Sequence, residues 1–279
     1  MEETLDTPLK ARILLSHAYF QHFAENNAID VLHIKGYAFG SDTYPPQRSS
    51  SDADLLVRPA HVNRLMYLLV KDGWEILTHF NTGSIFEHAA TIYHPYWGLA
   101  DIHKYFPGIG FANPSLAFDQ LWAQRRVKTI ARFPCTVPSL IDSRILVIVH
   151  GARSFAQPHP DTQYLIDQLS TEEWDNLRRR ARELHAEIAF DTALGNLEQH
   201  RGHPHYLMWK VISQQVPFYV EWWARFLRAH GTSEKMRVLW QIASVNEDHL
   251  AMSLGHPPTR QEKRQQLFER FERILPWKP

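Results

Sequence analysis

The residues best suited to chemistry in this chain are Asp52 and Asp54, which lead into the apolar run Leu55-Leu56-Val57. Such a run beside alternating residues is typical of a β-strand. Side chains two apart on a strand share a face, so both carboxylates should project together from the start of a buried strand. Two unpaired carboxylates this close repel each other and are costly to desolvate. A divalent cation removes that cost, and carboxylate oxygens suit Mg²⁺.

A pair of aspartates alone is often only a solvated turn or a salt-bridge site, but three neighbouring features favour a functional one. The turn Lys35-Gly36 follows a predicted strand, and a glycine there lets the backbone approach a phosphate closely. Arg48, in the following loop, can bind phosphate oxygens with its forked guanidinium. Asp101 lies in the middle of another predicted strand, where an aspartate is disfavoured and calls for a reason.

Three carboxylates from two adjacent strands can hold two divalent ions about 3.5–4 Å apart. This geometry suits in-line attack on phosphorus, with one ion activating the attacking oxygen and the other holding the triphosphate and the leaving pyrophosphate. We expect Asp52 and Asp54 to bridge the ions. Asp101 would complete the site of the activating ion and take the proton from the acceptor hydroxyl. Asp52→Ala or Asp54→Ala should then abolish turnover and leave folding nearly intact.

Several further polar residues have both a functional and a structural interpretation. His103 shares a strand face with Asp101, so it either orients that carboxylate, contacts a phosphate or is hydrogen-bonded in the core. Lys35 either contacts phosphate or extends its ammonium to solvent from a strand end. Three residues of the C-terminal half either contact substrate or serve helix capping and core hydrogen bonding, namely His150, Asp161 and Asp167. Four histidines could suggest a zinc site, namely His79, His88, His94 and His103. Their spacing matches no compact zinc-ligand pattern, so such a site is disfavoured.

The elements that position these residues change character along the chain. The periodicity predicts, in order, a helix over 8–26, a strand over 29–34, a loop over 36–51, a strand over 52–57, a helix over 60–72, and strands over 74–80, 84–93 and 97–105. After a short helix and a basic strand-like piece, helices are expected over 139–153, 161–169, 171–200, 204–229, 232–252 and 258–273. Ser170 and Glu173 mark one helix start. The predicted fold class is α+β: a small mixed sheet flanked by helices in domain 1–133, then an all-helical domain over 134–279.

The overall composition limits the kinds of binding partner and the cellular compartment that we expect for this protein. The 279 residues contain 30 Lys plus Arg and 30 Asp plus Glu, so a general basic coat for nucleic acid is not indicated. Cys135 is the single cysteine, which excludes an intrachain disulfide and fits a reducing cytosol. No apolar run approaches the roughly 20 residues of a membrane span, and the acidic N-terminus has no signal core. We therefore expect a cytoplasmic protein without a membrane partner.

Two groups in the helical half are interpreted as structural. One group is the arginine run Arg178, Arg179, Arg180 and Arg182. We interpret it as the solvated face of a helix, and the alternative is a docking site for an acceptor RNA or an acidic protein. Helical spacing favours a place in the core over a base-stacking platform for Trp209, Trp222, Trp223 and Trp240.

With these motifs in place, the chain resembles the uncharacterised nucleotidyltransferase family within the polymerase-β-like nucleotidyltransferase superfamily. The resemblance extends roughly over residues 10–200 and is carried by Ile34-Lys35-Gly36, the Tyr44-Pro45 and Arg48 loop, Ser51-Asp52-Ala53-Asp54-Leu55-Leu56-Val57 and Asp101-Ile102-His103. It implies Mg²⁺- and NTP-dependent nucleotidyl transfer on a small mixed sheet, with a helical domain completing the cleft. It further implies catalytic and metal-binding roles for Asp52, Asp54 and Asp101, and nucleotide contacts from Lys35, Gly36, Arg48, Ser51 and His103.

The chain departs from the superfamily at one position. The residue after the glycine is often Ser there and supplies a hydroxyl to phosphate, whereas this chain has Tyr37. Ser41, Ser49 or Ser51 would then have to compensate.

The leading hypothesis is an enzyme that moves a nucleoside monophosphate from an NTP to an acceptor hydroxyl or phosphate and releases pyrophosphate. The acceptor could be a small molecule, a peptide, a protein or an RNA end, and a toxin that modifies tRNA or protein uses the same chemistry. A catalytically silent nucleotide-binding or regulatory module of the same fold is the main alternative, and a phosphodiesterase or phosphatase is a third. The preferred NTP, the acceptor and the oligomeric state are left open.

Overall fold

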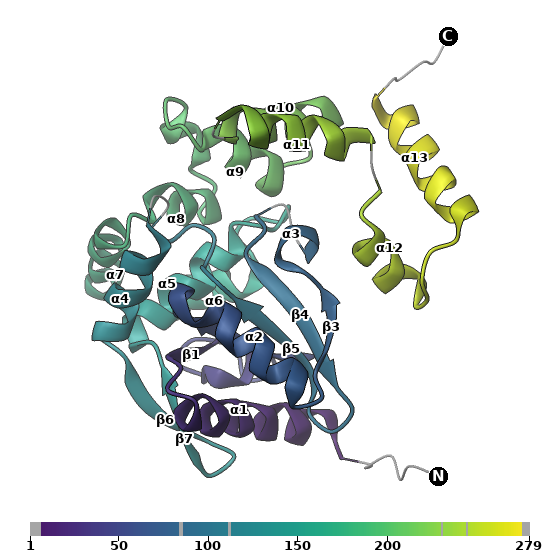
Figure 1. Ribbon diagram of the computed structural model, residues 1–279. Helices are drawn as coiled ribbons and strands as arrows, with labels where there is room; N and C mark the ends of the chain where they lie inside the picture. The colour runs from purple at the N-terminus through teal and green to yellow at the C-terminus, as the bar shows by residue number, and fades with distance from the viewer. Residues whose placement is uncertain (1–6, 84–85, 111–112, 230, 244, 275–279) are drawn as a thin grey trace.

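The computed structural model describes residues 7–83, 86–110, 113–229, 231–243 and 245–274. Its N-terminal part is built on a five-stranded mixed sheet of order β1-β2-β5-β4-β3 (Figure 1). The strands are β1 (Val31–Ile34), β2 (Asp52–Val57), β3 (Glu75–Thr78), β4 (Ala89–His94) and β5 (Gly98–His103). β2 and β5 pair in parallel, whereas the other three pairings of this sheet are antiparallel. The chain crosses over between β2 and β5 through α2 (Val62–Lys71), β3 and β4. The predicted α+β class is therefore confirmed.

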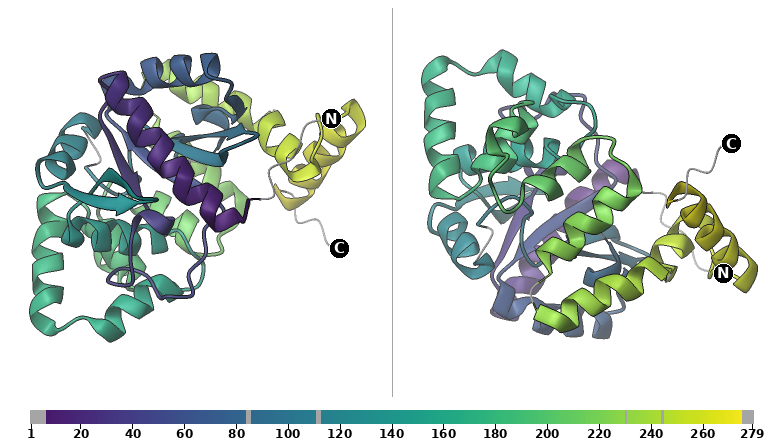
Figure 2. Two further views of the ribbon diagram at one scale, coloured as in Figure 1. Left: turned by 90° about the horizontal axis from the view of Figure 1, so that it is seen from below. Right: turned by 90° about the horizontal axis from the view of Figure 1, so that it is seen from above.

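Alternation along β2 divides the sheet into two faces. Ala53, Leu55 and Val57 point to one face, where they join a buried cluster with residues of α1 (Leu9–Asn26) and α2. Figure 2 shows α1 lying across this face. Asp52 and Asp54 alternate with these residues and therefore project from the opposite face.

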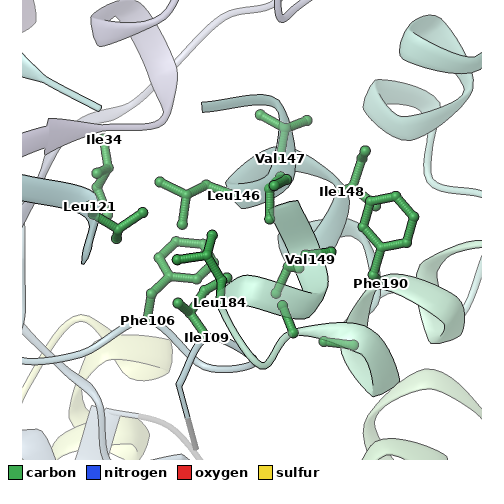
Figure 3. Close-up of a cluster of buried hydrophobic side chains, with 14 of the residues drawn as sticks. Ile34, Phe106, Ile109, Leu121, Leu146, Val147, Ile148, Val149, Leu184 and Phe190 are labelled. Carbon is green, nitrogen blue, oxygen red and sulfur yellow. The ribbon is translucent and has the colours of Figure 1, made fainter. Parts of the chain in front are cut away.

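The opposite face packs against helices of the C-terminal half. Its buried cluster joins Ile34 and Leu56 of the sheet to Leu146 and Val149 of α5 (Leu140–Gly151) and to Phe106 after β5 (Figure 3). The cluster thus takes residues from both sides of the predicted division between residues 133 and 134. That position lies in a separate hairpin of β6 (Arg126–Ile130) and β7 (Phe133–Val137). The division into two domains stays a prediction.

Several of the remaining helices are shorter than expected, and the short helix α3 lies where no helix was expected. The structure has α3 (Phe80–Gly83), α4 (Pro114–Ala123), α6 (Pro160–Gln168), α7 (Thr171–Glu183), α8 (Glu187–Ala193), α9 (Tyr206–Ser213), α10 (Phe218–Arg228), α11 (Gly231–Ala243), α12 (Glu247–Leu254) and α13 (Arg260–Ile274). Short 3₁₀ turns cover Gly36–Ala38, Pro59–His61 and Leu197–His200.

Several of the expected elements differ in length, and the predicted helix over 232–252 is divided into α11 and α12. The predicted helix over 171–200 breaks after α7, where His185 has a left-handed φ of 50°. The predicted helix over 204–229 breaks at Pro217, which caps the start of α10. The first two residues of the predicted strand 84–93 lie outside the described residues, and β4 begins at Ala89.

The helical half also corrects two expectations. Trp209 is fully buried as expected, but Trp223 is 56% and Trp240 is 73% exposed, so the prediction of a core position was wrong for both. Arg180 is buried against Asp142 at 2.8 Å between Nε and Oδ1, so it is not part of a solvated face. Throughout the part of the chain that the structure describes, no helix combines the length and the apolar character needed to cross a membrane.

Candidate functional site

The register of β2 and β5 brings two of the predicted carboxylates together. Asp54 is paired with Asp101 across the parallel strands, while Asp52 lies opposite Leu99. One ligand atom each from Asp54, Asp101 and His103 lies within 4.8 Å of the others. Asp52 projects from the same face two residues before Asp54. The charge of Asp54 acts on Asp52, and the charge of Asp52 acts on Asp101.

Asp54 is the most buried of the three carboxylates, with 4% of its surface exposed. Its Oδ1 forms a short ion pair with Lys35 Nζ and accepts a hydrogen bond from His103 Nε2 at 2.9 Å. Lys35 immediately follows β1 and has a φ of 57°, which is disfavoured for a residue other than glycine. The backbone at the end of β1 is therefore held in a rare conformation at the point where the ammonium meets the carboxylate.

His103 orients Asp54. Burial, together with the nearby charges of Lys35 and Arg153, holds the pKa of His103 well below its ordinary value, so the ring is neutral and Nε2 carries the proton that it donates. Its buried Nδ1 has no hydrogen-bond partner among the described residues. The partner suggested by the sequence was Asp101, the neighbour of His103 on its own strand, whereas the hydrogen bond goes across to Asp54 on β2.

Among the described residues, Asp101 forms no ion pair of this kind. Its Oδ1 accepts a hydrogen bond from Thr91 Oγ1 of β4 at 2.7 Å. Burial, and then the charge of Asp54, raises the pKa of Asp101 to about 6. Burial and the charge of Asp54 also raise the pKa of Asp52, although Ser50 and Ser51 donate to its Oδ1 at 3.3 and 3.4 Å.

The turn after β1 lies against the loop that leads into β2. Gly36 has a φ of 46°, and a Cβ added there would lie 2.6 Å from Ser50 Oγ, so both the conformation and the space require glycine. Tyr37 packs with the cluster on the α1 face, and Lys10 Nζ lies 5.5 Å from the centre of its ring. The hydroxyl closest to this turn therefore belongs to Ser50, which the sequence had not proposed. Ser51 is exposed beside Asp52.

Arg48 joins the loop to the helical half. Its Nε donates to Asp161 Oδ2 at 3.1 Å, and its guanidinium lies 5.3 Å from the ring centre of Tyr44. Asp161 is buried at the first turn of α6, where its backbone N–H is capped by His159 Nδ1. Asp161 thus contacts a predicted nucleotide-binding residue.

Two other residues suspected in the helical half have different surroundings. Burial, together with the charges of Arg153 and Lys35, lowers the pKa of His150 well below its ordinary value. The influence of these two cations indicates that His150 lies near the site. Asp167 instead accepts a hydrogen bond from Gln163, one turn earlier on the exposed side of α6.

Sequence reasoning missed Arg153, Thr91 and Ser50. Arg153 lies just beyond α5, and the fields of both Asp54 and Asp101 act on its guanidinium. A serine, a threonine and an isolated arginine occur throughout any chain, so only the fold reveals these three. His88 lies beside His103, with 5.1 Å between ring centres, whereas His94 is at the other end of β4, so the four histidines do not converge.

The donor set fits a hard divalent cation. Two carboxylates with raised pKa values flank a third that already has a cationic neighbour, and their oxygens are the ligands that Mg²⁺ prefers. Asp54 and Asp101 are close enough to share such an ion, and Asp52, two residues before Asp54 on the same face, could add a further oxygen. The Nε2 proton of His103 makes that nitrogen a donor to Asp54.

Comparison with known proteins places these features in a family. A search of curated proteins gave no match. One solved structure that the chain resembles is the crystal structure of a lincosamide antibiotic adenylyltransferase, LnuA, with lincomycin bound. The two share 17% sequence identity and a TM-score of 0.38, over 55% of this chain and 94% of that one. The sequence profile of the family described as "Uncharacterised nucleotidyltransferase" matches residues 19–202. Because this match spans more than half of the chain and contains every carboxylate of the site, the chain belongs to that nucleotidyltransferase family.

Proposed function

We propose that this nucleotidyltransferase moves a nucleoside monophosphate from an NTP to a hydroxyl or phosphate oxygen of an acceptor and releases pyrophosphate. The acceptor oxygen forms a bond to the α-phosphorus, and the bond from that phosphorus to the β-phosphate oxygen breaks. The observation that carries this proposal is the pairing of Asp54 with Asp101, with Asp52 on the same sheet face.

The three carboxylates would hold Mg²⁺, as one or two ions. When bound, the metal supplies charge that polarises phosphoryl oxygens and stabilises the negative charge of the transferring group. Burial of Asp52 and Asp101 makes such a cation favourable, because it offsets the carboxylate repulsion that raises their pKa values.

The chain's own groups would orient the substrates and move one proton. Asp101, which lies opposite Asp54 at the centre of the site, would accept the acceptor's proton. The backbone of Gly36, together with Arg48 and Ser51, borders the opening of β2 and would contact phosphate oxygens. Lys35 and His103 would hold Asp54 in its orientation by their two contacts with Oδ1.

The direct test incubates the protein with each NTP, Mg²⁺ and cell extract, and searches for mass gains that correspond to one transferred monophosphate. We expect one or more acceptors to gain that mass while pyrophosphate appears in equal amount. Asp101→Asn, which keeps the size of the side chain and the bond from Thr91, is the matched inactive control.

Two outcomes would favour other functions. Release of monophosphate or inorganic phosphate without any acceptor would indicate a phosphodiesterase or phosphatase. NTP affinity that is unchanged by chelating the metal, together with no turnover, would indicate a silent binding module. A labelled tRNA or protein would place the chain among toxin-like nucleotidyltransferases.

A further inference from the structure

Arg153 is a cation at this site to which none of the roles described above has been assigned. It follows the C-terminal end of α5 by two residues and is partly buried. Its Nη1 donates to Nε2 of His88 at 3.2 Å, and its guanidinium lies 5.8 Å from the ring centre of Phe106. Burial lowers the pKa of Arg153 to about 10, while the charges of Asp54 and Asp101 act in the opposite direction. The guanidinium therefore stays charged at neutral pH.

The other cations around the site are already paired with carboxylates. Lys35 forms an ion pair with Asp54, and Arg48 forms one with Asp161. Arg153 has no carboxylate within ion-pair distance among the residues that the structure describes, and its buried Nε has no hydrogen-bond partner there. A buried guanidinium without a counter-anion is costly, and an anion brought by a ligand would remove that cost.

The neighbouring histidine leaves part of the guanidinium available. Because Nη1 donates to His88, the acceptor nitrogen of that ring fixes the orientation of the guanidinium plane. Nε and Nη2 remain to form the parallel pair of hydrogen bonds with which arginine binds phosphate. The charges of Asp54 and Asp101 act on the guanidinium of Arg153, so the three groups are close in space. Phosphates that bind a metal ion held by these carboxylates would therefore lie near Arg153.

We propose that Arg153 binds phosphoryl oxygens of the NTP polyphosphate and so fastens the nucleotide to the helical half of the protein. This inference rests on the proposed function and adds to it a residue for substrate binding. His88 would be a positioning residue that acts through Arg153. Since Arg153 comes from the end of α5 while the carboxylates come from the sheet, the polyphosphate would connect the two halves.

The experiment measures binding of ATP, pyrophosphate and AMP by titration calorimetry in Mg²⁺ for the wild type, Arg153→Gln and Arg153→Lys. Loss of two charge-assisted hydrogen bonds should weaken ATP and pyrophosphate binding about 10- to 100-fold in Arg153→Gln. AMP affinity should stay nearly constant, so selectivity for ATP over AMP falls. Arg153→Lys should lie between, because it keeps the charge but not the fork.

Arg58→Gln is the matched control. Arg58 is also a half-buried arginine, but it pairs with Asp30 at 2.6 Å beyond the far end of β2. Its loss should reduce stability without changing ATP affinity.

Unchanged ATP affinity in Arg153→Gln, with normal binding by the wild type, would overturn the role of Arg153 and leave the proposed function standing. If Arg153→Gln does not fold, Arg153→Lys provides the test. Unchanged ATP affinity in Arg153→Lys would refute the pair of hydrogen bonds from the guanidinium to phosphate. A wild-type protein that binds neither ATP nor pyrophosphate in Mg²⁺ would instead refute the proposed function, and this inference with it.

Discussion

Asp54 and Asp101 lie directly opposite each other on the parallel strands β2 and β5, although two further strands and two α-helices separate them along the chain. Only Asp54 has a cation and a histidine on its carboxylate, while Asp101 has a threonine hydroxyl. The two acids are therefore close in space but differ in environment, and each should respond differently to substitution and to pH.

Asp54→Ala should abolish turnover and also destabilise the metal-free protein by about 3 kcal/mol, because it leaves the mostly buried ammonium of Lys35 without its partner. The sequence alone had predicted a nearly intact fold for this change. Asp52→Ala should abolish turnover with little loss of stability, because Asp52 has no such ion pair among the described residues. Chemical denaturation in chelator measures both, and the double change Lys35→Met with Asp54→Ala should recover part of the loss. Equal stability of the two single variants would contradict the structural role of the ion pair.

The contribution of Asp101 to the stability of the metal-free protein should fall as pH rises from about 4 to about 6. The pKa of Asp101 is raised from 3.8 to about 6, so the folded state binds the proton more tightly than the unfolded state. The contribution of this group is complete below the unfolded pKa and is lost as pH rises through the folded one. Buried histidines with lowered pKa values, such as His103 and His150, act in the opposite direction, so the wild type is compared with Asp101→Asn by thermal unfolding against pH in chelator. The stability of the wild type relative to Asp101→Asn should fall over this pH range, and a constant difference between the two proteins would contradict the role of Asp101.

Removal of Arg48 should weaken NTP binding and also reduce stability. Arg48 is 35% exposed, but its partner Asp161 is buried, so the change leaves a buried carboxylate without its ion pair. Titration calorimetry of Arg48→Ala with each NTP measures the loss, expected at about tenfold or more for a charged hydrogen bond. Asp161→Asn tests the orientation of Arg48 separately and should weaken binding less, because the guanidinium remains. An Asp161→Asn variant with the larger loss would indicate that Asp161 itself contacts substrate.

Gly36→Ala should destabilise the protein by about 1–2 kcal/mol through its left-handed φ alone, and the close approach to Ser50 should add to this. Adding Ser50→Gly to Gly36→Ala removes the clash but not the backbone cost, so it should restore stability only in part. Denaturant titration of the single and double variants separates the two contributions. Full recovery in the double variant would show that the conformation at this position carries no penalty.

Local patterns predicted the elements of the site well. The apolar run after Asp54 gave β2, and the serine before α7 forms the predicted capping box with Glu173. Alternation also gave the shared face of Asp52 and Asp54. These features depend on residues a few positions apart, which is why the sequence alone suffices for them.

What the sequence could not supply was pairing between distant segments. The bond from His103 to Asp54 depends on the register of two strands, and Arg153 reaches the site only through the packing of α5. The helix break at His185 carries neither glycine nor proline, so no local signal marks it. The roles of the site residues and the cytoplasmic location stay predictions.

The place of β5 between β2 and β4 has a consequence for synthesis of the protein. Both of its neighbours precede it in the chain, so they leave the ribosome before the strand that joins them. Until then each presents an open edge that can pair with another polypeptide. A nascent chain therefore cannot assemble its acidic centre before His103 has been added, and a product truncated ahead of Gly98 would be prone to aggregate.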